Sequence, residues 1–190
     1  LMCDGKRNRH GAFMRDYSKQ STQEKYLKPL FHQLFSSDEG AYNFDGVKTD
    51  FQADKVHDDM CPEDVSWRGE EQYFLNMYKL FYSEMKKHKE DAVHIGCAGN
   101  YHLAEYIDIN RTYDVFNSQY KEHEERAKKL YATAPGCPVA YDFHNFTENL
   151  EEYLDSAKKT GSSVQIGNIL QTRKDFFTEP EQADAKYYQI

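Results

Sequence analysis

The 190-residue sequence has no long hydrophobic run, no CxxC cysteine pair and no excess of positive charge. No window approaches the roughly 18 consecutive apolar residues of a membrane-spanning helix, so we expect no transmembrane segment. Lysine and arginine number 24 against 32 acidic residues, which gives a net charge of −8 with histidine neutral. Because proteins bind duplex nucleic acid largely by neutralising phosphates, this balance argues against a nucleic-acid partner.

Catalytic and cofactor-binding signatures are missing as well. The chain contains no P-loop, no dinucleotide-binding glycine fingerprint and no serine nucleophile elbow. We therefore expect no cofactor and no metal, and the sequence favours a binding protein over an enzyme. An enzyme or metal site remains the third hypothesis, and it would use His94, Cys97 and His102. The two histidines would stand about 12 Å apart along a helix, which favours ordinary hydrogen-bonded histidines over a shared ion.

Four cysteines, Cys3, Cys61, Cys97 and Cys137, are spread widely through the chain. Their even number allows two disulfides in three pairings, which the sequence cannot choose between. Disulfides would indicate an oxidising compartment, whereas buried thiols acting as small apolar side chains are the alternative.

Two N-x-[ST] sequons, at Asn110 and Asn145, are candidate glycosylation sites. Together with the even number of cysteines they predict a secreted or cell-surface glycoprotein.

Apolar residues recur at spacings of three and four along much of the chain, which predicts amphipathic helices. The expected helices cover residues 22–35, 62–88, 110–134 and 138–160, with a shorter one after 162. Residues 36–60 hold many acids and no period, and they predict one long acidic loop. Residues 92–109 allow a helix but contain two glycines, and their structure stays undecided.

No segment shows the sustained period of two that is typical of half-buried strands. We therefore predict an all-α fold, an antiparallel bundle of four to five helices with one long acidic loop, stapled by disulfides. The expected organisation is a polar N-terminal arm over residues 1–20, a single helical domain over 21–178 and a polar C-terminal tail over 179–190.

Tyrosine is abundant, with 15 residues beside 12 phenylalanines and one tryptophan. Several tyrosines fall off the expected core stripes, and the binding-surface candidates are Tyr42, Tyr82, Tyr101 and Tyr141. Exposed tyrosine is enriched in binding surfaces, although tyrosines that line helix flanks explain the same pattern.

The leading hypothesis is a domain that binds a protein or other macromolecule, and the acidic charge favours a partner with a basic patch. The alternative is a helical carrier whose aromatic interior holds a small apolar ligand.

Overall fold

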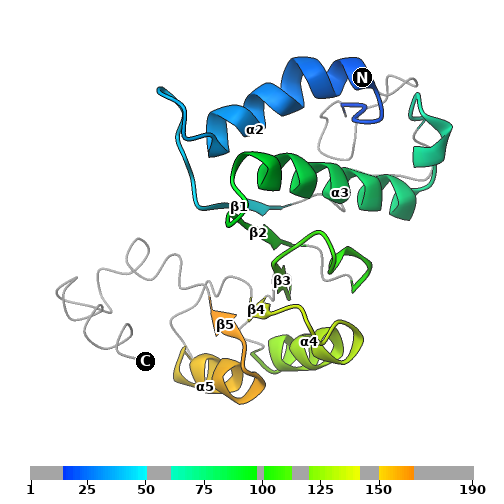
Figure 1. Ribbon diagram of the computed structural model, residues 1–190. Helices are drawn as coiled ribbons and strands as arrows, with labels where there is room; N and C mark the ends of the chain where they lie inside the picture. The colour runs from blue at the N-terminus through cyan, green and yellow to red at the C-terminus, as the bar shows by residue number, and fades with distance from the viewer. Residues whose placement is uncertain (1–14, 51–60, 98–100, 113–119, 142–149, 165–190) are drawn as a thin grey trace, which may run out of the picture. The chain divides into compact units, whose positions relative to one another are not determined.

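The structure is a computed structural model, and it describes residues 15–50, 61–97, 101–112, 120–141 and 150–164 (Figure 1). The chain divides into two compact units, Leu1–Asn110 and Arg111–Ile190. Cys3, Asn145 and the tail expected over residues 179–190 lie outside the described residues.

The first unit begins with one continuous helical segment. It consists of α1 (Gln20–Thr22), the π-helical η1 (Gln23–Leu27) and α2 (Lys28–Phe35). Leu27, Phe31 and Phe35 are buried because the spacing of four places them on one face. The helix predicted over residues 22–35 is therefore confirmed, and it begins two residues earlier than expected.

The second long helix, α3, runs from Glu70 to His88. Its buried stripe is Tyr73, Phe74, Met77, Tyr78, Phe81, Glu84 and Met85. The predicted start at Pro62 is wrong, because the chain forms a separate 3-10 turn, η3 (Val65–Trp67), before α3. Gly69 precedes the helix at a φ of +91°, a conformation that glycine adopts readily and that stops the helix from extending backwards.

The helices α2 and α3 lie side by side and pack against each other (Figure 1). The Phe31 and Phe81 rings contact each other between these helices, with centroids 5.6 Å apart and planes tilted by 42°. Aromatic side chains thus supply much of the packing of the first unit, as their number in the sequence suggests.

Within the residues that the structure describes, five short strands form one sheet in the order β1-β2-β3-β4-β5. The strands are β1 (Gly46–Thr49), β2 (Val93–Gly96), β3 (Ile109–Arg111), β4 (Val139–Tyr141) and β5 (Ser163–Val164). The pairs β1–β2, β2–β3 and β4–β5 are all parallel. Parallel neighbours need a crossover, and α3 lies between β1 and β2 in the chain.

Close approach of β1 to β2 depends on a glycine. Gly46 pairs with Val93, and a Cβ added at Gly46 would lie 2.4 Å from the Val93 carbonyl oxygen. No side chain fits at that distance, so Gly46 sets the spacing at the start of this strand pair.

The second unit contains α4 (Tyr120–Thr133) and α5 (Leu150–Thr160), which pack against each other. A small apolar core joins both helices to β4, and its buried members are Ala127, Leu130, Val139, Tyr141, Tyr153 and Ala157. Two expected helices are therefore shorter than predicted, since Asn110 lies in β3 and residues 139–141 form β4. The final helix expected after residue 162 is also wrong at its start, where Ser163–Val164 form β5.

The all-α bundle is thus contradicted, because the chain is an α/β protein with a parallel sheet. The expected disulfide staples are contradicted too. No disulfide joins Cys61, Cys97 and Cys137, the three cysteines within the described ranges. Cys97 and Cys137 are instead buried, each in a different unit, as small apolar side chains often are.

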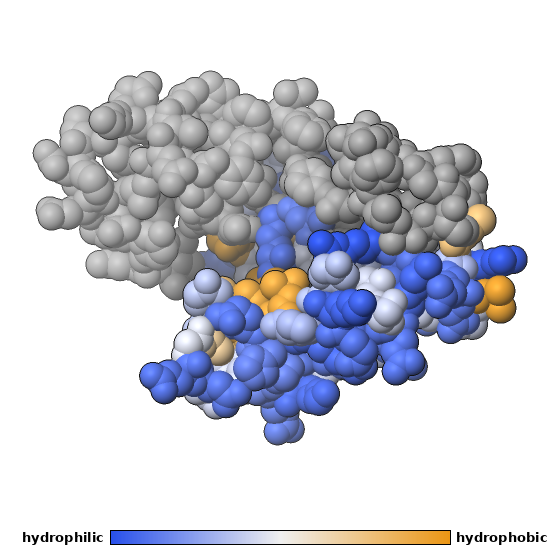
Figure 2. Space-filling model, turned by 90° about the horizontal axis from the view of Figure 1, so that it is seen from above, coloured by the Kyte–Doolittle hydropathy of each residue, from blue (hydrophilic) through white to orange (hydrophobic). Residues whose placement is uncertain are grey.

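The described residues on the face seen in Figure 2 are mostly hydrophilic, with separate hydrophobic areas. This agrees with a composition of 29% charged residues. Within the described part of the chain, no helix combines the length and the apolar character needed to cross a bilayer.

Candidate interaction surface

Exposed apolar side chains gather in one stretch of the first unit. Among the described residues, the exposed large apolar side chains are Tyr26, Leu30, Tyr42, Phe44, Val65 and Tyr101. Four of these six lie within residues 26–44. We call Tyr26 and Leu30 the helix pair and Tyr42 and Phe44 the loop pair.

The helix pair occupies the outer face of the first helical segment. Tyr26 and Leu30 are about one turn apart, so they share a face, and each is about half exposed. The guanidinium carbon of Arg15 lies 4.3 Å from the centroid of the Tyr26 ring. This is the geometry of a cation–π contact, and it shows that an arginine stacks well at this face.

The loop pair is held in place by the end of α2. The last carbonyls of a helix have no partner within the helix, and residues of the following loop satisfy two of them here. The amide of Tyr42 donates to the Gln33 carbonyl at 2.9 Å, and that of Phe44 donates to the Leu34 carbonyl at 2.8 Å. Both anchors are backbone groups, so alanine at positions 42 and 44 can form the same two hydrogen bonds.

The two rings of the loop pair stack on each other in the open. Their centroids are 5.2 Å apart and their planes differ by 11°. Tyr42 is 62% exposed and Phe44 is 48% exposed. Asn43 between them has a φ of +50°, a left-handed conformation that asparagine tolerates better than most residues. The pair therefore forms an exposed, pre-arranged aromatic platform.

Acidic side chains flank this platform. Asp38 and Asp45 have side chains that are 69% and 98% exposed, and Glu39 is exposed as well. Hydrogen bonds from Ser36 and His32 lower the pKa of Asp38, and the Lys89 ammonium lowers the pKa of Asp45. Both carboxylates are thus negatively charged at neutral pH. We call residues 38–45, which contain these acids and the loop pair, the acidic aromatic loop.

One cation of the protein already binds to this loop. The Lys89 ammonium donates to Asp45 Oδ1 at 2.6 Å, to Asn43 Oδ1 at 3.2 Å and to the Asn43 carbonyl at 3.3 Å. Three oxygens of the loop therefore surround one positive charge. This contact also ties the loop to the end of α3.

The four tyrosines named from the sequence fall in different environments. Tyr42 and Tyr101 are exposed, and Tyr82 is half-buried with its hydroxyl 3.3 Å from Asp108 Oδ1. Tyr141 is fully buried in the core of the second unit. Tyr26 and Leu30 fall at the helical spacing that predicts a helix over residues 22–35, and this spacing does not distinguish exposed from buried apolar side chains.

His94 lies in a buried polar network at the β1–β2 edge of the sheet. Its Nδ1 is 2.8 Å from the Tyr106 carbonyl, and because a carbonyl only accepts, Nδ1 carries the proton. Its Nε2 is 3.0 Å from the hydroxyl of Thr49, which is 2.9 Å from the Tyr78 hydroxyl. Burial lowers the pKa of His94, so the ring is neutral. These contacts hold strands and helix together inside the core.

The third hypothesis required His94, Cys97 and His102 to converge. His94 and Cys97 are buried, whereas His102 is exposed and its ring lies beside that of Tyr101, with a centroid distance of 3.9 Å and planes tilted by 38°. Within the described residues, no group of three or more histidine, cysteine, aspartate or glutamate side chains could hold a metal ion.

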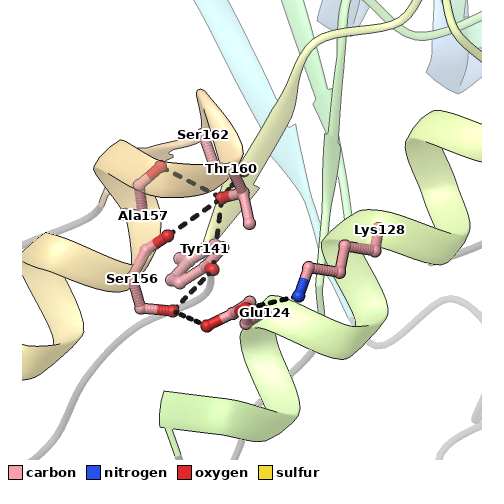
Figure 3. A network of polar contacts seen from close by, with 7 residues as sticks. All are labelled: Glu124, Lys128, Tyr141, Ser156, Ala157, Thr160 and Ser162. Carbon is pink, nitrogen blue, oxygen red and sulfur yellow. Dashed lines mark hydrogen bonds and ion pairs between the residues drawn. The ribbon is translucent and has the colours of Figure 1, made fainter.

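A second buried network lies in the other unit (Figure 3). The Ser156 hydroxyl donates to Glu124 Oε2 at 3.2 Å and lies 3.0 Å from the Tyr141 hydroxyl. The hydroxyl of Thr160 is 3.2 Å from the same tyrosine oxygen, and Lys128 pairs with Glu124 at the surface. The network links α4, β4 and α5, and its hydroxyls are largely enclosed, so it has the form of a structural contact.

The candidate carrier role concerns the aromatic interior. In the first unit these rings contact each other directly, for example Phe74 and Tyr78 with centroids 4.8 Å apart. A ligand-binding interior remains a prediction.

Of the two sequons that predict an extracellular location, only the one at Asn110 lies within the described residues. Asn110 is 1% exposed within β3, so a glycan there would have to be attached before this strand folds. Because no disulfide supports it, the extracellular location rests on the sequons alone and remains a prediction.

Comparison with known family models, with curated proteins and with solved structures finds no match to this chain. The function therefore has to be inferred from the chain itself.

Proposed function

We propose that this protein is a recognition domain that binds a protein partner through the acidic aromatic loop. The observation that carries the proposal is the stacked pair of exposed rings, Tyr42 and Phe44. Hydrophobic side chains exposed singly are common on any protein surface. Two stacked rings fixed by backbone hydrogen bonds are a larger and more ordered feature, and they support a binding role.

The energetics of the loop pair fit such a role. A buried aromatic residue removes about 150–250 Å² from water, and roughly half of that area is still exposed on each ring. Covering it would contribute about 2–3 kcal/mol per ring, at about 25 cal/mol per Å². Because the rings are already ordered, binding loses little side-chain entropy. These are the properties of the few residues that dominate most interfaces.

The helix pair extends the apolar area available to a partner. Leu34, whose carbonyl accepts from the Phe44 amide, lies one turn after Leu30 on the same helix. The backbone of the loop pair is therefore attached to the helix about one turn after Leu30. A partner that covered both pairs would contact about two turns of helix and the loop after it.

The test uses a displayed library of random peptides, selected on the full chain in parallel with a Tyr42→Ala/Phe44→Ala variant. We expect the wild-type chain to enrich peptides that fail to bind the variant. A Tyr101→Ala variant is the matched control, since it removes another exposed tyrosine of the first unit, 50% exposed against 62% for Tyr42, and should retain binding.

Two outcomes would overturn the proposal: enrichment of peptides that bind the double variant equally well, or no enrichment at all. Folding of the variant is checked by its circular dichroism spectrum and melting temperature. We expect both to match the wild type, because the loop is anchored by backbone groups.

A further inference from the structure

We propose, resting on the proposed function, that the partner presents an arginine side chain that stacks on Tyr42 and Phe44 and pairs with the acids beside them. The inference names the chemistry of the partner's contact residue. It is carried by the charge of the acidic aromatic loop, by its ring geometry, and by the contacts that Lys89 makes with this loop and Arg15 makes with the helix pair.

The charge of the loop selects a cationic partner. Asp38, Glu39 and Asp45 lie within eight residues, and the whole chain carries a net charge of −8. An anionic partner such as a phosphopeptide or a nucleic acid would be repelled. Asp38 contacts His32 and Asp45 contacts Lys89, yet 69% and 98% of their side chains stay exposed. A purely apolar partner would remove water from these carboxylates without offering a new hydrogen bond, and the desolvation of a carboxylate is costly.

The protein's own side chains show both halves of the proposed contact. The Lys89 ammonium is held by oxygens of Asn43 and Asp45, so this loop binds a cation. On the helix pair nearby in the chain, the Arg15 guanidinium lies over the Tyr26 ring at 4.3 Å. A partner arginine would combine the two, with its plane on the rings and its N–H groups toward the carboxylates.

Arginine suits this site better than lysine. The guanidinium is planar and weakly hydrated, so it stacks on an aromatic face while its edge donates to a carboxylate. The lysine ammonium is a compact, strongly hydrated charge that gains less from the rings. The two rings are nearly parallel and about half exposed, so the outer face of the stack can receive a guanidinium plane. The site should therefore discriminate between two peptides of equal charge.

The experiment compares two fluorescein-labelled probes, nona-arginine and nona-lysine, by fluorescence anisotropy against the full chain. We expect nona-arginine to bind about three- to five-fold more tightly, the range that a cation–π contact of exposed groups provides. The Tyr42→Ala/Phe44→Ala variant should bind both probes equally, whereas Tyr101→Ala should keep the preference. Raising the salt concentration should weaken both complexes.

Charge variants distinguish the effect of the acids in the acidic aromatic loop from the effect of the protein's net charge. Asp38→Asn/Glu39→Gln/Asp45→Asn should weaken both probes more than Glu125→Gln/Glu152→Gln/Asp155→Asn, which removes three exposed acids from the second unit. Equal losses in the two triple variants would show that only net charge matters and would overturn the inference.

The failure of this inference can be told apart from failure of the proposed function. If the library enriches peptides that need Tyr42 and Phe44 but contain no arginine, the recognition role stands and the arginine contact is overturned. Equal affinity of the two probes for the wild-type chain would also overturn it.

Discussion

The imidazole of His94 lies on the phenol ring of Tyr78, with centroids 5.2 Å apart and an interplanar angle of 24°. The same pairing recurs in the second unit, where His123 lies on Tyr141 at 5.1 Å and 18°. In both places a threonine hydroxyl at the end of a strand hydrogen-bonds the imidazole: Thr49 in the first unit and Thr112 in the second. Each unit thus places a histidine, a tyrosine and a threonine together in its interior.

The buried His94 should make stability depend on pH. Burial is the largest effect and lowers its pKa; Asp108 raises it and Lys86 lowers it further. The unfolded chain then binds a proton at about pH 6.5 that the folded protein does not yet bind. The free energy of unfolding should therefore fall as the pH decreases below about 6.5, by at most about 1.4 kcal/mol per pH unit from this residue.

Urea unfolding at a series of pH values tests this prediction. The His94→Gln variant should have a smaller slope than the wild type between pH 7 and pH 5. His102→Gln removes an exposed histidine and should keep the wild-type slope. An unchanged slope in His94→Gln would show that His94 does not titrate differently on folding.

The Thr49 hydroxyl should contribute to the free energy of unfolding through two buried hydrogen bonds. It contacts the Tyr78 hydroxyl and His94 Nε2, and Thr49→Val would leave both of these buried groups without this hydrogen-bond partner. We expect a loss of about 1–3 kcal/mol in the free energy of unfolding. A double-mutant cycle with Tyr78→Phe measures the coupling, and additive losses would argue against a shared network.

Replacement by alanine should affect the melting temperature differently at Gly46 and at Gly136. A Cβ at Gly46 would meet the Val93 carbonyl at 2.4 Å, whereas one at Gly136 would have nothing within 4 Å. Overpacking of this kind typically costs about 1–3 kcal/mol. Gly46→Ala should thus lower the melting temperature and Gly136→Ala should not, and similar effects from both would contradict the register of β1 and β2.

In the second unit, the Tyr141 hydroxyl should stabilise the contact between β4 and α5. Tyr141→Phe removes its hydrogen bonds with Ser156 and Thr160, at an expected loss of about 1–2 kcal/mol. Lys128→Met breaks the ion pair with Glu124 at the surface and should change stability little. Chemical denaturation of both variants measures this difference, and a neutral Tyr141→Phe would contradict the network in Figure 3.

The helices were predictable where a long apolar stripe faces one core. In α3 the acids Glu70 and Glu71 begin the helix and Lys86, Lys87 and His88 end it, so both the period and the end signals are present. The first helical segment shows the same periodicity, but its apolar residues cover a wider part of the helix surface than the part that is buried. Tyr26 and Leu30 fall at helical spacing and yet are exposed, because spacing cannot tell core from interface.

The strands escaped prediction for two physical reasons. They span only two to four residues, too short for a period of two to show. Parallel strands covered on both faces also lose the alternation of apolar and polar residues. All three residues of β4, Val139, Ala140 and Tyr141, are buried, and their apolar run fits a helix as well as a strand.

The candidate site was partly visible in the sequence. Tyr42 was named because it falls off the expected core stripes, and it is exposed. The stacking of Tyr42 on Phe44 depends on the left-handed Asn43 and on backbone hydrogen bonds to α2, neither of which composition reveals.

The most direct test of the recognition role is a titration of the isotope-labelled chain with a peptide selected from the library, followed by amide chemical shifts. The account predicts that the largest shifts fall on residues 38–45 and on the helix pair, Tyr26 and Leu30, while the amides of α5 stay unchanged. Shifts concentrated elsewhere, with residues 38–45 unaffected, would contradict it.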